Sequence, residues 1–464
     1  MLWVRSARRQ GPPRVTFGAR DAGASSSPIL RVMARPSNSS LPRSVPTLAA
    51  RGTAAAALPF DPDMPGVGTR VGTETGDQGP DTIDTLEPVS TLPAEQLEGE
   101  DALDTGLSLW AVVFAGGIGS RFWPLSSPER PKQLLALVGE RPLIAETVAR
   151  LAPTVRASQV LVVTSADIAD ALRAAIPEVP AANFLVEPRP LGTAAALAWG
   201  AQEVARRAGP RTTFVAIHAD LAVAYPAALR QLLVRAARIT AAGPPMVVLG
   251  ADALRPETGF GYALPAAPLD PDDSGPDAPR RVSRFVEKPG PLLAEELIAQ
   301  GALWHTGIVV ARAGAVLDVV AERTPELQPG LAALEAGKFD RFAGMIQSVS
   351  LERGVLERVA DLVVLPAACG WDDVGTWAAL RRVRELDDTG NGVWGRAHLV
   401  DASGCVVHAE GGTVVVYGVS GVLVVTRPGL TFVTTLDRAS ELRPLLDQLP
   451  DDVRRPGTSA RASL

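Results

Sequence analysis

The sequence contains few cysteines and few histidines. Of its 464 residues only two are cysteine, Cys369 and Cys405, and four are histidine. Two widely spaced cysteines in apolar context provide neither a disulfide framework nor a cluster with metal-ligand spacing. Their scarcity favours a reducing, cytoplasmic location.

Long hydrophobic runs and an excess of positive charge are also absent. The Val-rich segment 413–426 is interrupted by Gly418 and Gly421, whereas a spanning helix needs about 20 predominantly apolar residues. The chain has 45 Lys and Arg against 51 Asp and Glu, a formal net charge of −6. This balance gives no general electrostatic basis for binding nucleic acid. We therefore expect neither a membrane nor a nucleic acid as a partner.

Residues 1–106 lack the apolar periodicity of a folded domain. Residues 1–59 are rich in Arg, Ser, Ala and Pro and contain one acidic residue, Asp21, whereas residues 61–104 contain one basic residue, Arg70. Such segments cannot bury enough apolar surface to offset the entropy lost on ordering. The first segment also has the composition of an organelle transit peptide, but we favour a disordered tail or sequence upstream of the true start.

From Leu107 onward, strand-like and helix-like segments alternate. Short apolar runs bounded by Gly, Pro or Asp predict strands over residues 109–114, 160–164, 184–186, 213–218, 246–249, 281–286, 304–310 and 362–366. Apolar residues three or four apart predict helices over residues 142–151, 166–176, 194–208, 227–239 and 292–300. This alternation predicts an α/β domain over residues 107–390, with a Rossmann-like mixed, mostly parallel sheet.

Two segments depart from the alternation. Residues 265–279 are rich in Pro, Asp and Gly, which predicts an inserted loop. From Gly392 to about Val433, short Val-rich runs are separated by Gly, Asp and Ser. This pattern predicts a small β-domain within residues 391–464.

A glycine-rich segment follows the first expected strand. Gly116, Gly117 and Gly119 allow a tight turn and a close approach of the backbone to a bulky ligand. Successive N–H groups in such a loop can converge on an anion, and Arg121 and Lys132 add positive charge. Because open α/β sheets bind ligands at the carboxyl ends of their strands, the segment predicts a phosphate-binding loop.

The loop differs from the two common nucleotide-binding motifs. The dinucleotide fingerprint needs a third glycine where Phe122 stands, and no Gly-Lys-Ser/Thr run follows. The glycines alone are compatible with a plain turn beside two solvated cations. The full string, Gly-Gly-x-Gly-x-Arg-Phe-Trp-Pro-Leu-Ser followed by Pro-Lys-Gln, resembles the signature of the sugar-phosphate nucleotidyltransferases. Within them it is most similar to the mannose-1-phosphate guanylyltransferases.

This resemblance runs from about Leu109 to Leu446 and leaves residues 1–106 unexplained. It implies transfer of a guanylyl group from GTP to mannose 1-phosphate, giving GDP-mannose and pyrophosphate by metal-assisted in-line attack at the α-phosphate. It also implies Mg²⁺ or another divalent cation as cofactor, and a left-handed β-helix as the C-terminal β-domain. The resemblance leaves open whether the chain forms a homodimer.

The resemblance assigns roles to individual residues of the catalytic centre. By it, the nucleotide contacts are Ala115, Gly116, Gly117, Gly119, Ser120, Arg121, Lys132, Glu187 and Thr193. The metal ligands are Asp220, in His-Ala-Asp where the family has Pro-Ala-Asp-His, and Asp373, in Trp-Asp-Asp-Val-Gly-Thr-Trp. The catalytic residues are Arg121, Lys132, Asp220, Lys288 and Asp373. Outside this resemblance, an aspartate after a strand is as typical of a turn or helix cap.

The sugar site is assigned in the same way. Lys288, in Phe-Val-Glu-Lys-Pro, would pair with the sugar phosphate, and Glu287 would accept from sugar hydroxyls. The other implied sugar contacts are Glu257, Gly259 and Gly261 in Pro-Glu-Thr-Gly-Phe-Gly-Tyr, and His305 and Thr306. A lone Glu-Lys-Pro is otherwise typical of a surface turn.

Three departures from the family pattern affect the base and sugar contacts. Gly192-Thr193-Ala194-Ala195-Ala196 stands where the family has Asn-Thr-Ala-Pro-Ala. His218 and Leu221 replace the proline and histidine that flank the metal aspartate in the family. Trp304-His305-Thr306-Gly307 stands where the family has Trp-Asn-Ser-Gly. The sequence therefore favours the reaction type more strongly than the substrate. The alternatives are another sugar 1-phosphate, such as a manno-heptose or glucose phosphate, another triphosphate, or a nucleotide-sugar-binding regulatory protein. Retention of both Asp220 and Asp373 argues against the regulatory protein.

A chain that begins at Leu107 should fold and function like the full-length chain, because residues 1–106 have no apolar periodicity with which to dock. We expect the thermal transition and the specific activity of the two chains to agree. Calorimetry and a pyrophosphate-release assay would measure them, and a loss of either would show that the extension contacts the fold.

Overall fold

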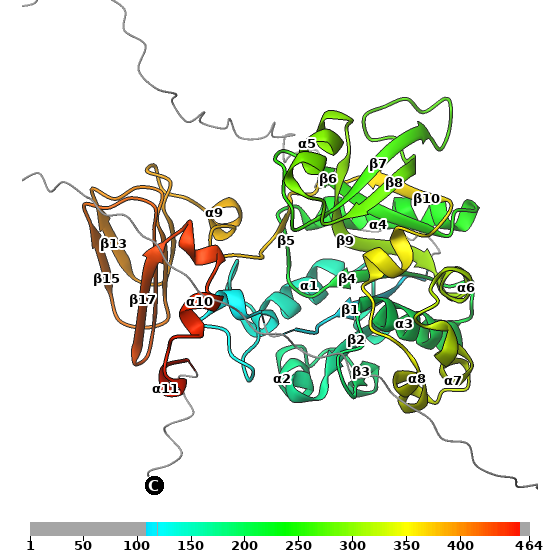
Figure 1. Ribbon diagram of the computed structural model, residues 1–464, viewed down its shortest axis with the longest axis horizontal. Helices are drawn as coiled ribbons and strands as arrows, with labels where there is room; N and C mark the ends of the chain where they lie inside the picture. The colour runs from blue at the N-terminus through cyan, green and yellow to red at the C-terminus, as the bar shows by residue number, and fades with distance from the viewer. Residues whose placement is uncertain (1–107, 118, 455–464) are drawn as a thin grey trace, which may run out of the picture. The chain divides into compact units, whose positions relative to one another are not determined.

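The computed structural model describes residues 108–117 and 119–454 (Figure 1). The predicted extension, residues 1–106, lies outside the described residues. The predicted strands and helices of the α/β domain are all observed, with end points that differ from the prediction by three residues at most.

The core of the α/β domain is a nine-stranded sheet. Its strands are β1 (Trp110–Phe114), β2 (Val160–Ser165), β3 (Phe184–Glu187), β4 (Thr213–His218), β6 (Met246–Asp252), β7 (Gly261–Pro268), β8 (Arg280–Glu287), β9 (Leu303–Arg312) and β10 (Leu362–Pro366). They lie in the order β3-β2-β1-β4-β9-β6-β10-β8-β7. Only β8 and β9 run opposite to the other strands of this sheet, which is therefore mixed and mostly parallel, as predicted.

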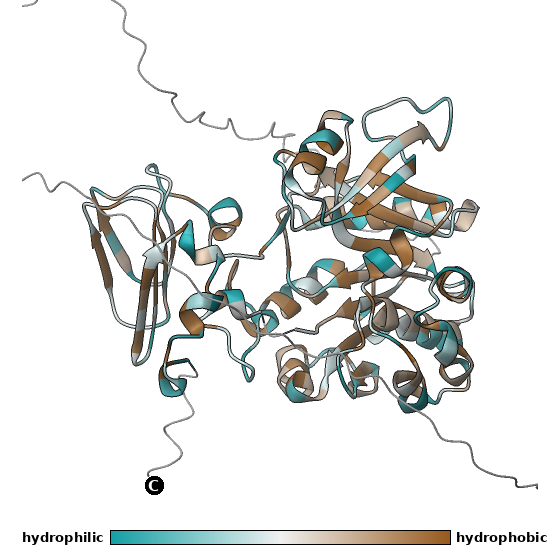
Figure 2. Ribbon diagram, viewed as in Figure 1, coloured by the Kyte–Doolittle hydropathy of each residue, from teal (hydrophilic) through white to brown (hydrophobic). Residues whose placement is uncertain are grey.

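Helices cover both faces of the sheet (Figure 1). They are α1 (Leu143–Leu151), α2 (Ala166–Ala175), α3 (Thr193–Ala208), α4 (Pro226–Ala242), α5 (Pro291–Ala299), α6 (Ala313–Arg323), α7 (Leu331–Glu335) and α8 (Phe339–Met345). Strand side chains alternate between the faces, so Val112 of β1 packs in one apolar cluster with α3 and α6. Ala111 and Val113 pack in another with α1, α2 and α4. Figure 2 shows the apolar strands between these helices.

A glycine sets the close packing of α3 on β1. A Cβ at Gly200 would come within 2.5 Å of a Val112 methyl carbon. Any larger residue there would push α3 away from the sheet and disturb the helix whose first residue, Thr193, is a predicted nucleotide contact.

The predicted loop at residues 265–279 was partly wrong. Residues up to Pro268 belong to β7, which forms an antiparallel hairpin with β8, so only residues 269–279 connect the two strands. Proline cannot donate to a ladder and is tolerated at edge strands and bulges. β7 is the last strand in the order, and it also pairs with β9 at Tyr262 and Ala263. Beyond Ala263 it pairs with β8 alone, and its register with β8 shifts at Pro265 and Pro268. Composition signalled the prolines, but only the sheet position shows that they are compatible with a strand.

The C-terminal region has a β-helix-like arrangement. Its strands are β12 (Gly392–Trp394), β13 (Ala397–Val400), β14 (Val406–Ala409), β15 (Val414–Tyr417), β16 (Val422–Arg427) and β17 (Leu430–Thr435). β12, β14 and β16 stack in parallel in one sheet and β13 and β15 in another, while β17 closes the first sheet antiparallel to β16. Successive strands thus alternate between two sheets, as coils of a β-helix do.

Short helices border this region: α9 (Leu380–Val383), α10 (Arg443–Leu446) and α11 (Asp451–Arg454). The predicted domain boundary at residue 390 falls between α9 and β12. Among the described helices, none has the length and apolar character needed to cross a membrane.

Candidate active site

Several predicted site residues lie at one edge of the sheet. In the ladder between β1 and β4, Phe114 lies opposite His218, so the glycine loop and Asp220 follow neighbouring strand ends. Glu187 ends β3 opposite the last residue of β2, at the same edge. Because β9 runs antiparallel to β4, it is the beginning of β9, with His305, that reaches this edge.

A second, two-stranded sheet brings the two predicted metal ligands together. β5 (Leu221–Val223) and β11 (Trp371–Asp373) pair antiparallel, with Asp373 opposite Leu221. The Lys132 Nζ lies 2.9 Å from the Asp220 Oδ2 and 4.0 Å from the Asp373 Oδ1. Lys132 is only 6% exposed. One buried ammonium is therefore shared by two carboxylates from distant parts of the chain.

The two carboxylates differ in their electrostatics. Burial raises the pKa of Asp373, and the neighbouring Asp220 and Asp372 charges add to this effect against Lys132. Burial also acts on Asp220, but the Lys132 ammonium and His218 hold the pKa of Asp220 below its ordinary value. Two carboxylates beside one ammonium carry a net negative charge, which a further cation can neutralise.

The donor set suits a hard divalent cation. Both carboxylates keep about a third of their side-chain surface exposed, 31% for Asp220 and 32% for Asp373. Magnesium binds through one or two carboxylates together with substrate phosphates and water. Within the described part of the chain, no three His, Cys, Asp or Glu side chains gather in a way that would hold a metal by themselves. Substrate and water would therefore have to complete the shell.

Asp372, the neighbour of Asp373, has a different partner. Its carboxylate accepts from Arg382 Nε at 2.6 Å and Nη2 at 2.7 Å. Successive strand residues point to opposite faces, which separates Asp372 from Lys132. This arrangement distinguishes the two adjacent aspartates, which the sequence motif alone does not.

The glycine loop folds back on the segment that carries Lys132. Gln133 Nε2 donates to the carbonyl oxygens of Gly116 at 2.7 Å and Gly117 at 3.1 Å. Gly119 has a φ of +65°, and a Cβ there would lie 2.4 Å from the Lys132 Cβ. The sequence motif included Gln133, but only this contact reveals its bracing role.

The other predicted residues of the loop are less constrained. Ala115 is buried, and its N–H donates to the Val163 carbonyl. Ser120 begins a short 3-10 helix that ends at Phe122. The Arg121 side chain is exposed, and within the described part of the chain no residue forms an ion pair with it. Its guanidinium is therefore accessible to an incoming anion.

Glu187, a predicted nucleotide contact, is a buried acid with an unused acceptor. Its Oε1 is buried and has no hydrogen-bond partner among the described residues. Burial raises the pKa of Glu187 to about 7, against the opposing charge of Arg189. Such an oxygen is suited to a donor on a ligand.

Thr193, the other predicted nucleotide contact beyond the loop, already has a structural partner. Its Oγ1 accepts from the Leu351 N–H at 2.7 Å. The preceding Gly192 has a φ of +87°, and a Cβ there would lie 2.4 Å from the Val349 carbonyl oxygen. Thr193 therefore holds the start of α3 against residues 349–351.

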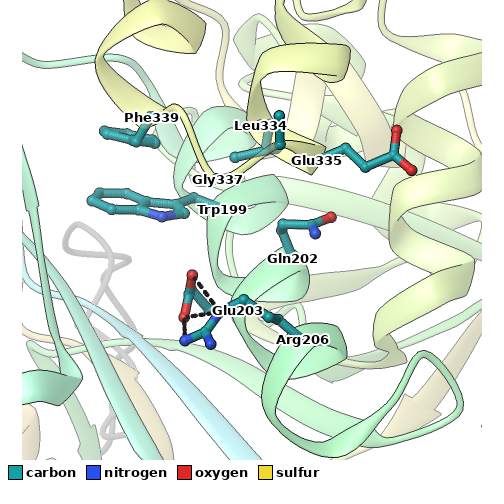
Figure 3. Close-up of a pocket in the computed structure, with 9 residues that line it drawn as sticks. Trp199, Gln202, Glu203, Arg206, Leu334, Glu335, Gly337 and Phe339 are labelled. Atoms are coloured by element: carbon teal, nitrogen blue, oxygen red, sulfur yellow. Dashed lines mark hydrogen bonds and ion pairs between the residues drawn. The ribbon is translucent and has the colours of Figure 1, made fainter.

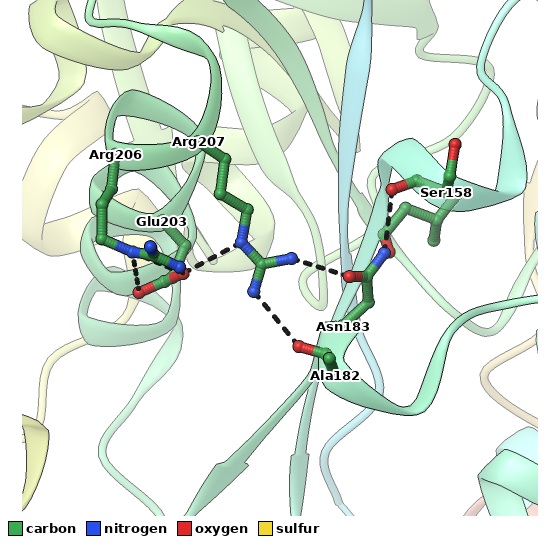
Figure 4. Close-up of polar contacts among 7 residues, drawn as sticks. Ser158, Ala182, Asn183, Glu203, Arg206 and Arg207 are labelled. Carbon is green, nitrogen blue, oxygen red and sulfur yellow. Dashed lines mark hydrogen bonds and ion pairs between the residues drawn. The ribbon is translucent and has the colours of Figure 1, made fainter.

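A polar network fixes α3 against the start of β3 (Figure 4). Glu203 accepts from Arg206 and Arg207 of the same helix. Arg207 Nη1 then donates to the Asn183 Oδ1 at 2.7 Å, and Asn183 donates to the Val160 carbonyl at 2.8 Å. Because β3 ends in Glu187 and α3 begins at Thr193, the network stabilises the framework of both predicted contacts.

Glu287 and Lys288 form a close pair beside Gly261. Lys288 Nζ lies 2.6 Å from the Glu287 Oε1, and a Cβ at Gly261 would lie 3.0 Å from the Glu287 Oε2. Burial raises the pKa of Glu287, although Lys288 opposes the shift. Lys288 has a φ of +53°, a conformation that costs a non-glycine residue about 1–3 kcal/mol and is common at functional sites.

The loop containing Glu257 and Gly259 packs against β9 and β11. Phe260 lies edge-on to Trp304 and Trp371, with ring centroids 5.3 Å and 5.6 Å away. These rings join the loop to the strands that carry His305 and Asp373. Glu257 itself is half-buried beside Arg255, while Gly259 is exposed.

His305 and Thr306 are both buried. The Thr306 hydroxyl donates to the Leu249 carbonyl at 2.9 Å, so its hydrogen is committed within the protein. Both ring nitrogens of His305 lack a partner among the described residues. Burial lowers the pKa of His305 to about 4, although the Glu352 carboxylate opposes the shift. At neutral pH the ring is an uncharged donor and acceptor.

Two charged or polar residues near this group were not predicted as contacts. Glu352 begins a π-helix, Glu352–Leu356, and its negative charge acts to raise the pKa of both His305 and Glu287. His218 acts to lower the pKa of Asp220, Asp373 and His305. His218 was visible as a departure beside Asp220, whereas no local pattern marked Glu352.

A separate pocket lies between α3 and the α7–α8 region (Figure 3). Trp199 stacks on Phe339 at its side, with ring centroids 3.3 Å apart. The lining contains none of the predicted site residues. The candidate active site is therefore the Lys132, Asp220 and Asp373 cluster with the strand ends around it.

Two family models match successive parts of the chain. The sequence model of the nucleotidyl transferase family matches residues 110–389. That of the MannoseP isomerase/GMP-like beta-helix domain matches residues 395–449.

Individual relatives cover most of the chain. The mannose-1-phosphate guanylyltransferase of Sinorhizobium fredii is 28% identical over 376 residues, which cover 78% of this chain and 72% of the relative. The xanthan biosynthesis protein XanB of Xanthomonas campestris is 32% identical over 365 residues, 75% of this chain and 74% of the relative. A crystal structure from Thermus thermophilus, titled mannose-1-phosphate geranyltransferase, is 31% identical with a TM-score of 0.67, covering 74% of this chain and 99% of that one.

Glu187→Gln should remove a pH-dependent loss of stability. The pKa of Glu187 is raised to about 7 in the fold, whereas an unfolded glutamate titrates near about 4.3. Between these values the folded chain keeps a proton that the unfolded chain has lost, so the free energy of unfolding falls as pH rises. Calorimetry should give similar Tm values for variant and wild type near about pH 4 and a higher Tm for the variant near about pH 8. A constant difference would contradict the raised pKa.

Proposed function

This chain belongs to the nucleotidyl transferase family, among its sugar-phosphate nucleotidyltransferases, and we propose that it transfers a guanylyl group from GTP to mannose 1-phosphate. The products are GDP-mannose and pyrophosphate. The observation that carries the proposal is the Lys132 ammonium shared by Asp220 and Asp373 at the edge of the sheet. The name of the relative at 28% identity, mannose-1-phosphate guanylyltransferase, supports GTP and mannose 1-phosphate as the substrates.

The chemistry demands positioning and charge neutralisation. A phosphate oxygen of the sugar 1-phosphate attacks the α-phosphorus of the triphosphate, and the bond to pyrophosphate breaks. The nucleophile is already an anion, so no general base is required. Two polyanions must approach each other, and fixed cations lower that cost. The protein's task is therefore to hold the partners in line.

Lys132 and Arg121 suit binding of the triphosphate. Lys132 is fixed by Asp220 and by packing beneath the glycine loop, while the exposed Arg121 can reach an anion from solvent. Asp220 and Asp373 would hold Mg²⁺ or another divalent cation, which supplies Lewis-acid neutralisation of the reacting phosphate. Glu187, with its unused buried oxygen, would accept from the base or ribose.

Lys288 and Glu287 suit the sugar phosphate. In the ligand-free protein the Lys288 ammonium is neutralised by Glu287 at 2.6 Å, and a phosphate would compete for it. Gly261 keeps the space beside Glu287 free of a side chain. Glu287 and His305 would then contact sugar hydroxyls, with Glu257, Gly259 and Thr306 along the wall.

A second candidate keeps the reaction and changes the substrate. His305 presents a rigid ring where an asparagine is usual in the family, and neither of its nitrogens has a partner among the described residues. Another sugar 1-phosphate, such as a manno-heptose or glucose phosphate, or another triphosphate, is the alternative. Pyrophosphate release measured over a grid of triphosphates and sugar 1-phosphates tests both candidates. Release with no combination would favour a nucleotide-sugar-binding regulatory protein.

Asp220→Asn and Asp373→Asn should each lower turnover by about a hundredfold or more, the usual cost of losing one preorganised charge-stabilising group. Each change keeps the side-chain shape and removes a negative charge from the proposed metal site. Asp372→Asn is the matched control, because Asp372 pairs with Arg382 instead. The assay is pyrophosphate release at saturating Mg²⁺. Near wild-type turnover of either variant would show that its carboxylate is not a metal ligand.

His305→Asn should sharpen the preference for mannose 1-phosphate over glucose 1-phosphate by about tenfold in kcat/KM, equivalent to ~1.4 kcal/mol. A short amide places its donor and acceptor closer together than an imidazole ring does. The substitution should leave the contacts to the phosphate unchanged. An unchanged ratio would show that His305 packs beside Phe285 and does not read the sugar.

A further inference from the structure

We propose that the ion pair between Arg130 and Glu410 positions Lys132, so that the C-terminal β-domain takes part in triphosphate binding. The phosphate loop is defined here as residues 119–137, which contain both Arg121 and Lys132. The inference rests on the proposed function for its kinetic consequence. The contacts that carry it join regions matched by two separate family models.

The ion pair is bidentate. Arg130 Nη1 donates to the Glu410 Oε2 at 2.9 Å, and Arg130 Nη2 donates to the Glu410 Oε1 at 2.8 Å. Two parallel bonds between a planar guanidinium and a carboxylate restrict orientation as well as distance. Glu410 directly follows β14 of the β-domain, and Arg130 precedes Lys132 by two residues.

The backbone around Arg130 can transmit this restraint. Ser127 and Arg130 exchange backbone hydrogen bonds at 3.0 Å and 3.2 Å, which close a tight turn. Pro131 then leads directly into the short helix Lys132–Leu134. With a closed turn on one side and a helix on the other, little freedom remains between the Arg130 and Lys132 side chains.

Two further arginines fasten the phosphate loop on either side of this point. Arg427 of β16 donates from Nη1 to the Pro124 carbonyl at 2.8 Å. Arg384 Nε donates to the Leu137 carbonyl at 2.9 Å, and its Nη2 lies 2.9 Å from the His408 Nδ1 of β14. The loop is therefore tied to the β-domain along its length.

An apolar cluster supplies the stability of this junction. It combines Phe122, Leu125 and Leu135 of the phosphate loop with Leu423 and Phe432 of the β-domain.

The metal-site segment joins the same cluster. Trp377, four residues after Asp373, is fully buried there, and its Nε1 donates to the Trp123 carbonyl at 3.3 Å. Of the three segments that meet at this site, those carrying Lys132 and Asp373 thus rest on the β-domain.

The cluster and the ion pair have separable roles. Apolar packing is strong but non-directional, so it holds the loop in place without setting the direction of Lys132. Arg130 is 41% exposed and Glu410 17%, and a partly exposed pair contributes little to global stability. Breaking the pair should therefore change the loop and leave the fold intact.

The test is Glu410→Gln, compared with Glu326→Gln. Glu326 forms an equivalent bidentate pair with Arg358, at 2.7 Å and 2.8 Å, away from the phosphate loop. We expect Glu410→Gln to raise the KM for GTP by about tenfold and to leave the KM for mannose 1-phosphate unchanged. Its Tm should fall no further than that of Glu326→Gln, and Arg130→Lys, which keeps the charge without the fork, should give an intermediate KM.

Hydrogen exchange provides a readout that does not need turnover. Backbone amides of residues 119–137 should exchange faster in Glu410→Gln and not in Glu326→Gln. Unchanged exchange together with an unchanged KM for GTP would overturn the proposal, as would equal rises in both KM values with a lowered Tm. Faster exchange in a protein that releases no pyrophosphate with any substrate would support positioning and reject the proposed function.

Discussion

The central constraint of this structure is the buried Lys132 ammonium between Asp220 and Asp373. Two carboxylates brought together repel each other, and a shared cation makes their proximity tolerable. The ammonium lies 2.9 Å from one and 4.0 Å from the other, so the pair keeps a net negative charge. A site with this balance suits a divalent cation that binds together with substrate phosphates.

The rest of the fold provides two supports for this cluster. The mixed sheet supplies Asp220 from the end of β4 and aligns Glu187 and His305 with the same edge. The β-domain supports the loop that carries Lys132, through an apolar cluster and a bidentate ion pair. A catalytic group that must neutralise charge at a defined distance benefits from support on both sides, because charge–charge energies fall with distance.

The proposed sugar contacts follow a different principle. Glu287 and His305 are buried, and the two nitrogens of His305 have no partner among the described residues. Discrimination between epimers depends on where hydrogen-bond donors and acceptors stand, and a shift of one group changes the preferred sugar. A hydrogen bond depends more steeply on the placement of a single group than an interaction between charges does, because charge acts at longer range.

The sequence by itself determined the elements whose signals are local. β1 and α3 were predicted because apolar periodicity depends on neighbours along the chain, and the resemblance to the nucleotidyltransferase motifs singled out Lys132, Asp220 and Asp373. The assignment of the two aspartates as metal ligands remains a prediction, but the tertiary structure brings all three residues together.

Only the tertiary structure decided the features that depend on distant partners. The second half of β7 was predicted as a loop because of its prolines. Proline is compatible with a strand at the edge of a sheet, and the sequence does not show which strand lies there. The brace from Gln133, the influence of Glu352 on His305 and the Arg130–Glu410 pair join segments whose separation hides them from any local pattern. Pairing across such distances is set by how the whole chain packs, since no window of sequence contains both partners.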